Sequence, residues 1–140
     1  LVGSEMCIRD RPQAVYQGAD YRFSVERAIL LDTHTGLRLD CLLRVSWRNP
    51  WLPPPNAGAL LRAEDDRGNE YPQFQNRPFL TGRYLHGGPL PGASPLPVRY
   101  YELSICQVDP KAETITLLLD PFGAVEARLT IPLREEKAHG

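Results

Sequence analysis

LRLDCLLRVSW, residues 37–47, alternates apolar and polar side chains from end to end, with Leu42 as the one exception. A period of two places alternate side chains on one face of an extended strand, whereas a helix needs a period of about 3.6. The stretch therefore predicts a long β-strand with one buried face. That face consists of the odd positions, Leu37, Leu39, Cys41, Leu43, Val45 and Trp47.

Four other segments repeat this alternation. Their apolar positions are Tyr21, Phe23 and Val25, then Tyr101, Leu103 and Ile105, then Ile115, Leu117 and Leu119, and finally Val125, Ala127, Leu129, Ile131 and Leu133. In the first of these segments the phase is lost at residues 27–28, which predicts a β-bulge before Ile29. Outside a charged tail at residues 134–137, the sequence has no helical periodicity.

Turn-forming sequences separate the predicted strands. DDRGN at residues 65–69 is typical of a hairpin in which Gly68 adopts a left-handed conformation. DPFG at residues 120–123 has the residue order of a type I turn. Seven or eight short strands joined by such turns predict an all-β, antiparallel sandwich of immunoglobulin-like size. We expect its core to contain Leu39, Cys41, Leu43, Val45, Trp47, Leu103, Ile105, Leu117, Leu129 and Ile131.

Two Pro-rich segments interrupt this scheme, at residues 48–58 and 75–97. Proline removes hydrogen-bond donors from a sheet and glycine weakens strands, so long regular structure is not expected there. In the second segment, Tyr84 and Leu85 predict a short edge strand, and residues 87–97 are expected to be mobile. Loops of this length in a compact domain are usually functional or disordered.

Composition limits the classes of function. The net charge of −1 argues against a broad nucleic-acid surface, which would need clustered Lys and Arg. No apolar run reaches the roughly 18 residues of a membrane span. We expect residues 12–133 to form one domain and residues 134–140 to form a charged tail.

The first eleven residues, LVGSEMCIRDR, resemble one translated frame of a sequencing-library adapter. This resemblance implies that the segment is an artefact and that the chain is a fragment, so we exclude the segment from the fold prediction. Removing it takes away two acids and two bases, which leaves the net charge unchanged. We expect residues 1–11 to be disordered and to pack against nothing.

The remaining cysteines, Cys41 and Cys106, lie far apart in strand-like runs. They predict either a disulfide between facing sheets or two free thiols, and we favour free thiols. The histidines share no local spacing with cysteines or acids, so no metal or other cofactor is expected. No Gly-x-Ser-x-Gly elbow or phosphate-binding glycine loop is present, and the chain is predicted not to be an enzyme.

Several segments together resemble a bacterial family of immunoglobulin-like, telokin-like accessory domains. They are FSVERA at 23–28, RVSW at 44–47, LLRAEDDRGNEY at 60–71 and YEL at 101–103. Members of the family are mostly of unknown function and occur in secreted, lipid-anchored and other extracytoplasmic proteins. The resemblance implies a β-sandwich outside the cytoplasm and brings no catalytic residues.

Two groups of residues are candidates for binding. Trp51, Pro53 and Pro54 belong to a segment that favours polyproline II, which aromatic grooves recognise. We favour instead a stiff connection with Trp51 packed on the edge of the sandwich. Within the second loop the candidates are Arg83, Tyr84 and His86. Arg83 and Tyr84 could join Arg77, Arg99 and Tyr100 in a basic, aromatic patch for a carbohydrate or an acidic peptide. We favour the alternative that these arginines are scattered over the surface and solvated, and that they form no binding site.

The sequence therefore predicts a non-catalytic accessory module. It would contact a protein or a cell-envelope component, or act as a spacer. The alternative is a ligand- or glycan-binding module that uses residues 75–97, and a remote alternative is a small enzyme of unrecognised type.

Overall fold

Ten strands and no helix make up the part of the chain that the structure describes. The computed structural model describes residues 5–9, 14–53, 61–73, 82–90, 97–119 and 127–134, with the backbone alone for residues 5–9 and 61. The strands are β1 (Glu5–Arg9), β2 (Ala14–Gln17), β3 (Tyr21–Thr33), β4 (Gly36–Trp47), β5 (Leu61–Asp65), β6 (Glu70–Tyr71), β7 (Tyr84–Pro89), β8 (Val98–Val108), β9 (Thr114–Leu119) and β10 (Ala127–Pro132). The predicted all-β class is confirmed.

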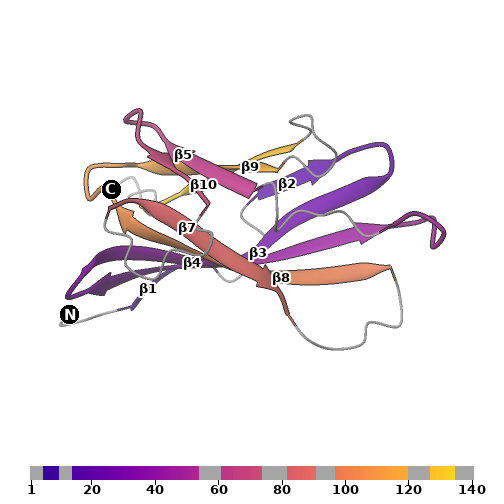
Figure 1. Cartoon of the computed structure of the whole chain (residues 1–140), viewed down its shortest axis with the longest axis horizontal. Coiled ribbons are helices and arrows are strands. Elements are labelled where there is room, and N and C mark those ends of the chain that lie inside the picture. Colours follow the sequence, from indigo (N-terminus) through magenta and orange to yellow (C-terminus); the bar gives the residue numbers. More distant parts are fainter. Residues whose placement is uncertain are drawn as a thin grey trace, which may run out of the picture.

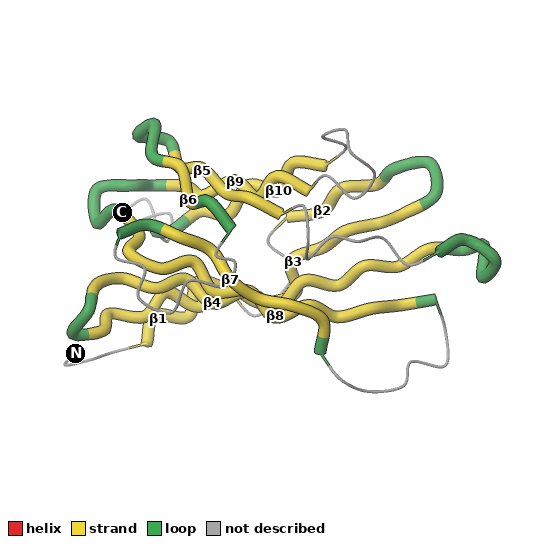
Figure 2. The backbone as a smooth tube through the Cα atoms, in the orientation of Figure 1, coloured by secondary structure: helices red, strands yellow, loops and turns green. Residues whose placement is uncertain are grey.

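The strands form two antiparallel sheets that pack in two layers (Figure 1). The larger sheet has the order β1-β3-β4-β8-β7, with β2 also paired to β3, and the smaller one has the order β10-β9-β5-β6. Described turns lie at both ends of the strands (Figure 2). We call the end with residues 66–69 and 109–113 the Asp65 end, and the end with residues 18–20 and 48–53 the Trp51 end.

The alternation of β4 places its odd side chains between the two sheets. Leu39, Leu43 and Val45 are fully buried, and Trp47 is 7% exposed. They belong to one hydrophobic cluster with residues of the opposite sheet such as Leu117 and Ile131. All ten core residues predicted from the sequence are buried.

A bulge in β3 changes which positions face the core. The β3–β4 register shifts between Val25 and Arg27, so Glu26 is the additional residue. Phe23 and Val25 are buried before it, whereas Ala28 and Leu30 are buried after it. An extra residue inverts the alternation of a strand, and the bulge predicted from the lost phase is confirmed.

Two further predictions concern the turns between strands. Gly68 has a φ of 86°, and the Asp65 N–H donates to the Asn69 carbonyl at 3.0 Å, which confirms the hairpin between β5 and β6. The turn predicted at residues 120–123 lies outside the described residues, although β9 and β10 pair in the expected antiparallel manner.

The edges of the larger sheet differ from the sequence prediction. Glu5–Arg9 does not remain unpaired, because it forms β1 and pairs with residues 28–31 of β3. An edge strand presents free N–H and C=O groups that bind extended backbone of almost any sequence. At the other edge, β7 includes Gly87, Gly88 and Pro89, so these residues are strand rather than mobile loop. Most of the remaining loop, residues 74–81 and 91–96, lies outside the described residues.

Gly87 and Gly88 provide a test of the β7–β8 pairing. A Cβ atom on Gly87 would lie 2.2 Å from the Glu102 carbonyl oxygen, whereas one on Gly88 would meet nothing within 4 Å. We expect Gly87→Ala to lower the free energy of unfolding by about 1–3 kcal/mol, as overpacking typically does. Gly88→Ala should change it by less than about 0.5 kcal/mol. Urea denaturation measures both, and equal midpoints for the two variants would contradict this packing.

Candidate functional site

Trp51 stands out from the described surface because its side chain is 91% exposed. It lies on a turn in which Asn49 Oδ1 accepts the Trp51 N–H at 3.0 Å and the Asn49 carbonyl accepts the Leu52 N–H at 3.1 Å. Beyond the turn, the Tyr21 hydroxyl donates to the Pro53 carbonyl at 2.6 Å. The segment is therefore fixed on both sides of the exposed indole.

The expectation that Trp51 packs on the sandwich edge is wrong. Leu52, the next residue, takes the position against the core and is partly buried there. The Asn49 turn directs Trp51 away from the protein instead. Pro53 is exposed, and Pro54 lies outside the described residues.

Two hollows flank Leu52 at the Trp51 end. They have volumes of about 560 and 460 Å³, and both are lined by Ala19, Asp20 and Leu52. Arg22 and Arg48 contribute to the larger hollow. Tyr16 and Tyr21 contribute to the smaller one.

A third hollow, of about 790 Å³, lies at the opposite end of the larger sheet. Tyr84 and His86 of β7 line it, with their ring centroids 5.9 Å apart and the rings inclined by 30°. The β3–β4 turn, Arg38 and Cys106 form much of the rest of the lining. The structure thus brings together two of the residues predicted in the second loop, Tyr84 and His86.

The remaining members of the predicted basic, aromatic patch are separated from this hollow. Arg83 lies 3.8 Å from Asp109 in an ion pair. Tyr84 is opposite Cys106 on β8, which is six residues and therefore about 20 Å from Tyr100. Arg77 lies outside the described residues.

Polar groups beside the third hollow bind one another. Arg38 makes two hydrogen bonds to Asp40, at 3.0 and 3.1 Å, and Ser104 donates to the same carboxylate at 2.8 Å. His86 is opposite Ser104 in the β7–β8 register but is not the acceptor of this hydroxyl. A serine nucleophile requires a base that accepts its proton, and Asp40 has its negative charge offset by Arg38.

Both thiols are free and hold their protons tightly. Burial raises the pKa of Cys41 to about 12, with a further contribution from Asp40. Burial also raises the pKa of Cys106, against an opposing hydrogen bond with Tyr84. Cys41 is opposite Leu103 on the inner face, whereas Cys106 is opposite Arg38 on the outer face, so the alternative of a disulfide between facing sheets is wrong. Thiolate chemistry is disfavoured at both positions because the thiolate is the nucleophilic form.

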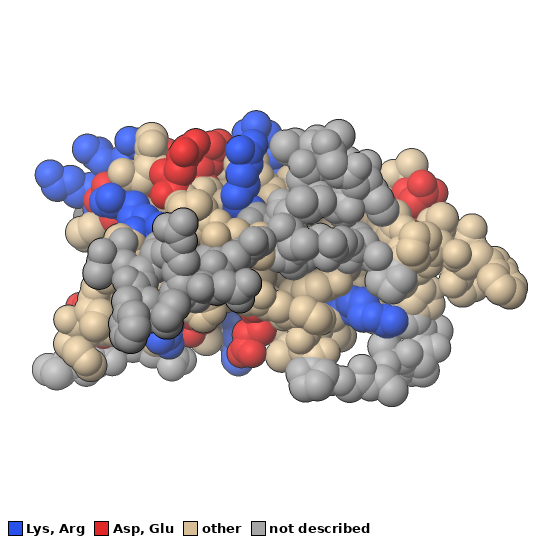
Figure 3. Space-filling model, in the orientation of Figure 1, with Lys and Arg blue, Asp and Glu red and all other residues tan. Residues whose placement is uncertain are grey.

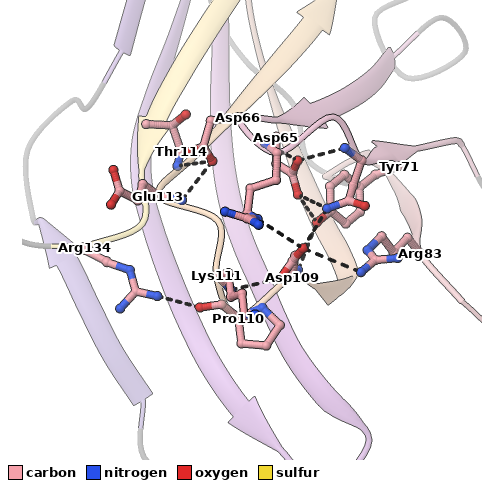
Figure 4. Close-up of polar contacts among 12 residues, drawn as sticks. Asp65, Asp66, Tyr71, Arg83, Asp109, Pro110, Lys111, Glu113, Thr114 and Arg134 are labelled. Atoms are coloured by element: carbon pink, nitrogen blue, oxygen red, sulfur yellow. Dashed lines mark hydrogen bonds and ion pairs between the residues drawn. The ribbon is translucent and has the colours of Figure 1, made fainter.

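A polar cluster joins the β5–β6 turn to the β8–β9 connection (Figure 4). Asp65 Oδ1 accepts the N–H groups of Arg67 and Asn69, each at 2.9 Å. Asp65 Oδ2 accepts the Asn69 side-chain amide at 2.8 Å and the Tyr71 hydroxyl at 2.9 Å. Each Asp65 oxygen therefore accepts two hydrogen bonds, and the role of this carboxylate is to stabilise the β5–β6 turn.

Contacts distant in sequence complete the cluster. The Asn69 amide also donates to Asp109 at 2.8 Å, and the Asp109 N–H donates to the Tyr71 hydroxyl at 3.0 Å. Burial raises the pKa of Tyr71 to about 12, which keeps its hydroxyl protonated as a donor to Asp65. Acidic and basic side chains are intermingled at this end of the molecule (Figure 3). Sequence analysis missed the part played by Asp109 because forty positions separate it from Asn69.

Within the described residues, no three His, Cys, Asp or Glu side chains are grouped so that they could hold a metal ion. None of the described segments is a helix long and apolar enough to cross a membrane. Comparison of the chain with family models, curated proteins and solved structures gave no match.

Asp65 should make stability depend on pH in the acidic range. Burial alone would raise the pKa of Asp65, but hydrogen bonds from Asn69, Tyr71 and the Arg67 backbone outweigh it and lower the pKa. The stabilisation is therefore complete above the unfolded-state pKa of about 3.9 and is lost as pH falls through the folded-state pKa.

We expect Asp65→Asn to be less stable than wild type at neutral pH and to lose less additional stability on acidification. Urea denaturation across a pH series measures both effects. Glu70→Gln, which removes an exposed carboxylate from the same hairpin, is the control and should keep the steeper acid dependence of wild type. An undiminished acid dependence in Asp65→Asn would exclude this role.

Proposed function

We propose that the chain is a non-catalytic, immunoglobulin-like accessory module that contacts a protein or a cell-envelope component. Immunoglobulin domains have one sheet with the strand order ABED and a second built on strands G, F and C. The orders β3-β4-β8-β7 and β10-β9-β5-β6 fit these sheets if β3 is strand A and β10 is strand G. This correspondence and the resemblance to telokin-like bacterial domains support an extracytoplasmic accessory role.

The observation that carries the contact function is the exposure of Trp51 on a fixed turn. Tryptophan is enriched among the residues that dominate binding energy at protein interfaces. Leaving 91% of its side chain in water forgoes the burial that usually stabilises this residue. A turn held by Asn49 and Tyr21 reduces the conformational entropy lost on binding, since the backbone that carries the indole is already positioned.

Polar chemistry within the described residues supports a role without catalysis. Ser104 donates to an Asp40 that is paired with Arg38, and both cysteine thiols have raised pKa values. These groups therefore have a structural role in the outer face and the core and no reactive one.

A ligand- or glycan-binding function is the second candidate, supported by the hollow beside Tyr84 and His86. Its volume of about 790 Å³ falls within the range of small-molecule sites, and its lining combines an aromatic pair with polar groups. NMR titration with soluble oligosaccharides tests it. Shifts confined to Tyr84 and His86 and lost in Tyr84→Ala would favour this function over the contact function.

Trp51 should contribute to binding and contribute little to folding. A photo-crosslinking amino acid at position 51 should capture a partner in cells, with position 62, also exposed, as the control. With that partner purified, Trp51→Ala should weaken binding by at least about 10-fold.

The free energy of unfolding should change by less than about 0.5 kcal/mol in Trp51→Ala, against about 3–5 kcal/mol in Trp47→Ala. Unchanged affinity of Trp51→Ala would reject the proposed contact.

A further inference from the structure

The smaller of the two hollows that flank Leu52 is mainly aromatic and apolar. Its volume is about 460 Å³, and five ring-bearing or aliphatic side chains line it, those of Tyr16, Tyr21, Phe23, Leu52 and Pro53. Residues 18–20 of the β2–β3 turn complete the described lining, in which Asp20 is the only charged residue. A ligand in this hollow would therefore be recognised by ring faces and apolar contacts more than by charge.

Tyr16 and Leu52 supply the accessible apolar surface of the hollow. Both are partly exposed, whereas Tyr21 is 7% exposed and Phe23 is fully buried. The Tyr16 and Phe23 rings have centroids 6.1 Å apart and are inclined by 49°. Phe23 therefore supports the Tyr16 ring from the core side, and the hollow presents a fixed aromatic ring beside Leu52.

The protein itself binds one proline carbonyl at this hollow. The Tyr21 hydroxyl donates to the Pro53 carbonyl at 2.6 Å. A proline residue has no N–H, so it is recognised through its carbonyl and through packing of its ring. Aromatic-lined grooves bind proline-rich segments by such contacts. The Tyr21–Pro53 contact is an example, within the same chain, of the chemistry that the hollow offers.

Trp51 lies close to the same hollow. It directly precedes Leu52, and consecutive Cα atoms are only about 3.8 Å apart. A polyproline II helix has three residues per turn and rises about 3.1 Å per residue, so prolines three positions apart lie on one face, about 9 Å from each other. A segment of this shape can place one proline against Tyr16 and the next against the exposed indole.

We propose that Tyr16, Leu52 and Trp51, which we call the aromatic platform, dock a proline-rich segment of a partner protein in the polyproline II conformation. Such a segment is already extended before it binds, so it loses little conformational entropy. Tryptophan and tyrosine are among the residues most enriched at binding hot spots. This inference rests on the proposed contact function and adds the surface and the chemistry of the partner.

Two other occupants fit the aromatic platform less well. The Pro53 carbonyl of each chain is held by Tyr21 of the same chain, which disfavours exchange of this segment with a second copy. A saccharide also stacks on aromatic rings, but its several hydroxyl groups need polar partners. Asp20 is the only charged side chain in the described lining, and the Tyr21 hydroxyl is engaged by Pro53.

The test selects binders to the immobilised full chain from two displayed libraries of decapeptides. One library has fixed prolines in a Pro-x-x-Pro spacing, and the other has alanine at the same two positions. We expect binders from the proline library alone. Fluorescence anisotropy should show that Trp51→Ala and Tyr16→Ala each weaken binding by at least about 10-fold. Tyr100→Ala, which removes an exposed tyrosine from β8, is the control and should leave the affinity unchanged.

A second variant tests the hollow without removing a ring that packs on the core. Ala19 is exposed in the β2–β3 turn and lines the hollow, so the longer side chain of Ala19→Arg should obstruct the ligand. We expect a loss of affinity of at least about 10-fold. Thr35→Arg, in the exposed turn at the other end of β3, is the matched control. Ala19→Arg replaces Tyr16→Ala if the latter has a lower urea midpoint than wild type.

The remaining outcomes separate this inference from the proposed contact function. Peptides that depend on Trp51 but bind equally well to Tyr16→Ala and Ala19→Arg would overturn the aromatic platform and leave the contact function standing. Equal enrichment from the alanine library, or no binders from either library while crosslinking at position 51 captures a partner, would have the same meaning. Absence of both binders and a crosslinked partner would count against both proposals. A dimer in sedimentation that is lost in Trp51→Ala, or an NMR shift of the Trp51 indole on addition of oligosaccharides, would also overturn the proline-rich partner.

Discussion

Burial of one face of β4 is the constraint on which the rest of the structure depends. β4 pairs with β3 on one side and β8 on the other, and its odd side chains meet the smaller sheet. A one-residue slip of β4 would bring Arg38, Asp40 and Arg44 into the core, where unpaired charges are strongly unfavourable. Burial therefore fixes the register of the larger sheet, and with it which side chains of β4 lie on the outer face.

Sequence patterns revealed the core because burial acts on every second residue of the same segment. Leu39, Leu43, Leu117 and Ile131 could be assigned from alternation alone, and the bulge at Glu26 from a break in it. The hairpin closed by Gly68 could be assigned because turn geometry depends on a few adjacent residues. These features share one property, namely that their causes are local in sequence.

Features formed between distant residues could not be predicted in this way. Asn69 and Asp109 are forty positions apart, and only the folded chain brings them to 2.8 Å. Trp51 was assigned to the sandwich edge because tryptophan usually seeks burial, but Leu52 occupies that position and the Asn49 turn directs the indole outward. The β1 strand was missed because main-chain pairing at an open edge requires little of the side chains.

The extra residue in β3 gives the outer face two different halves. Before Glu26, the outward positions of β3 are Arg22 and Ser24, beside the arginine and tyrosine of the neighbouring strands. After it, they are Ile29 and Leu31, and β1 pairs with the strand at those residues. An insertion or deletion of odd length in β3 would therefore exchange its inward and outward side chains, whereas one of even length would preserve both the core and the exposed surface. We therefore expect relatives of this domain to vary the outward side chains of β3 and to change the length of the strand only by even numbers of residues.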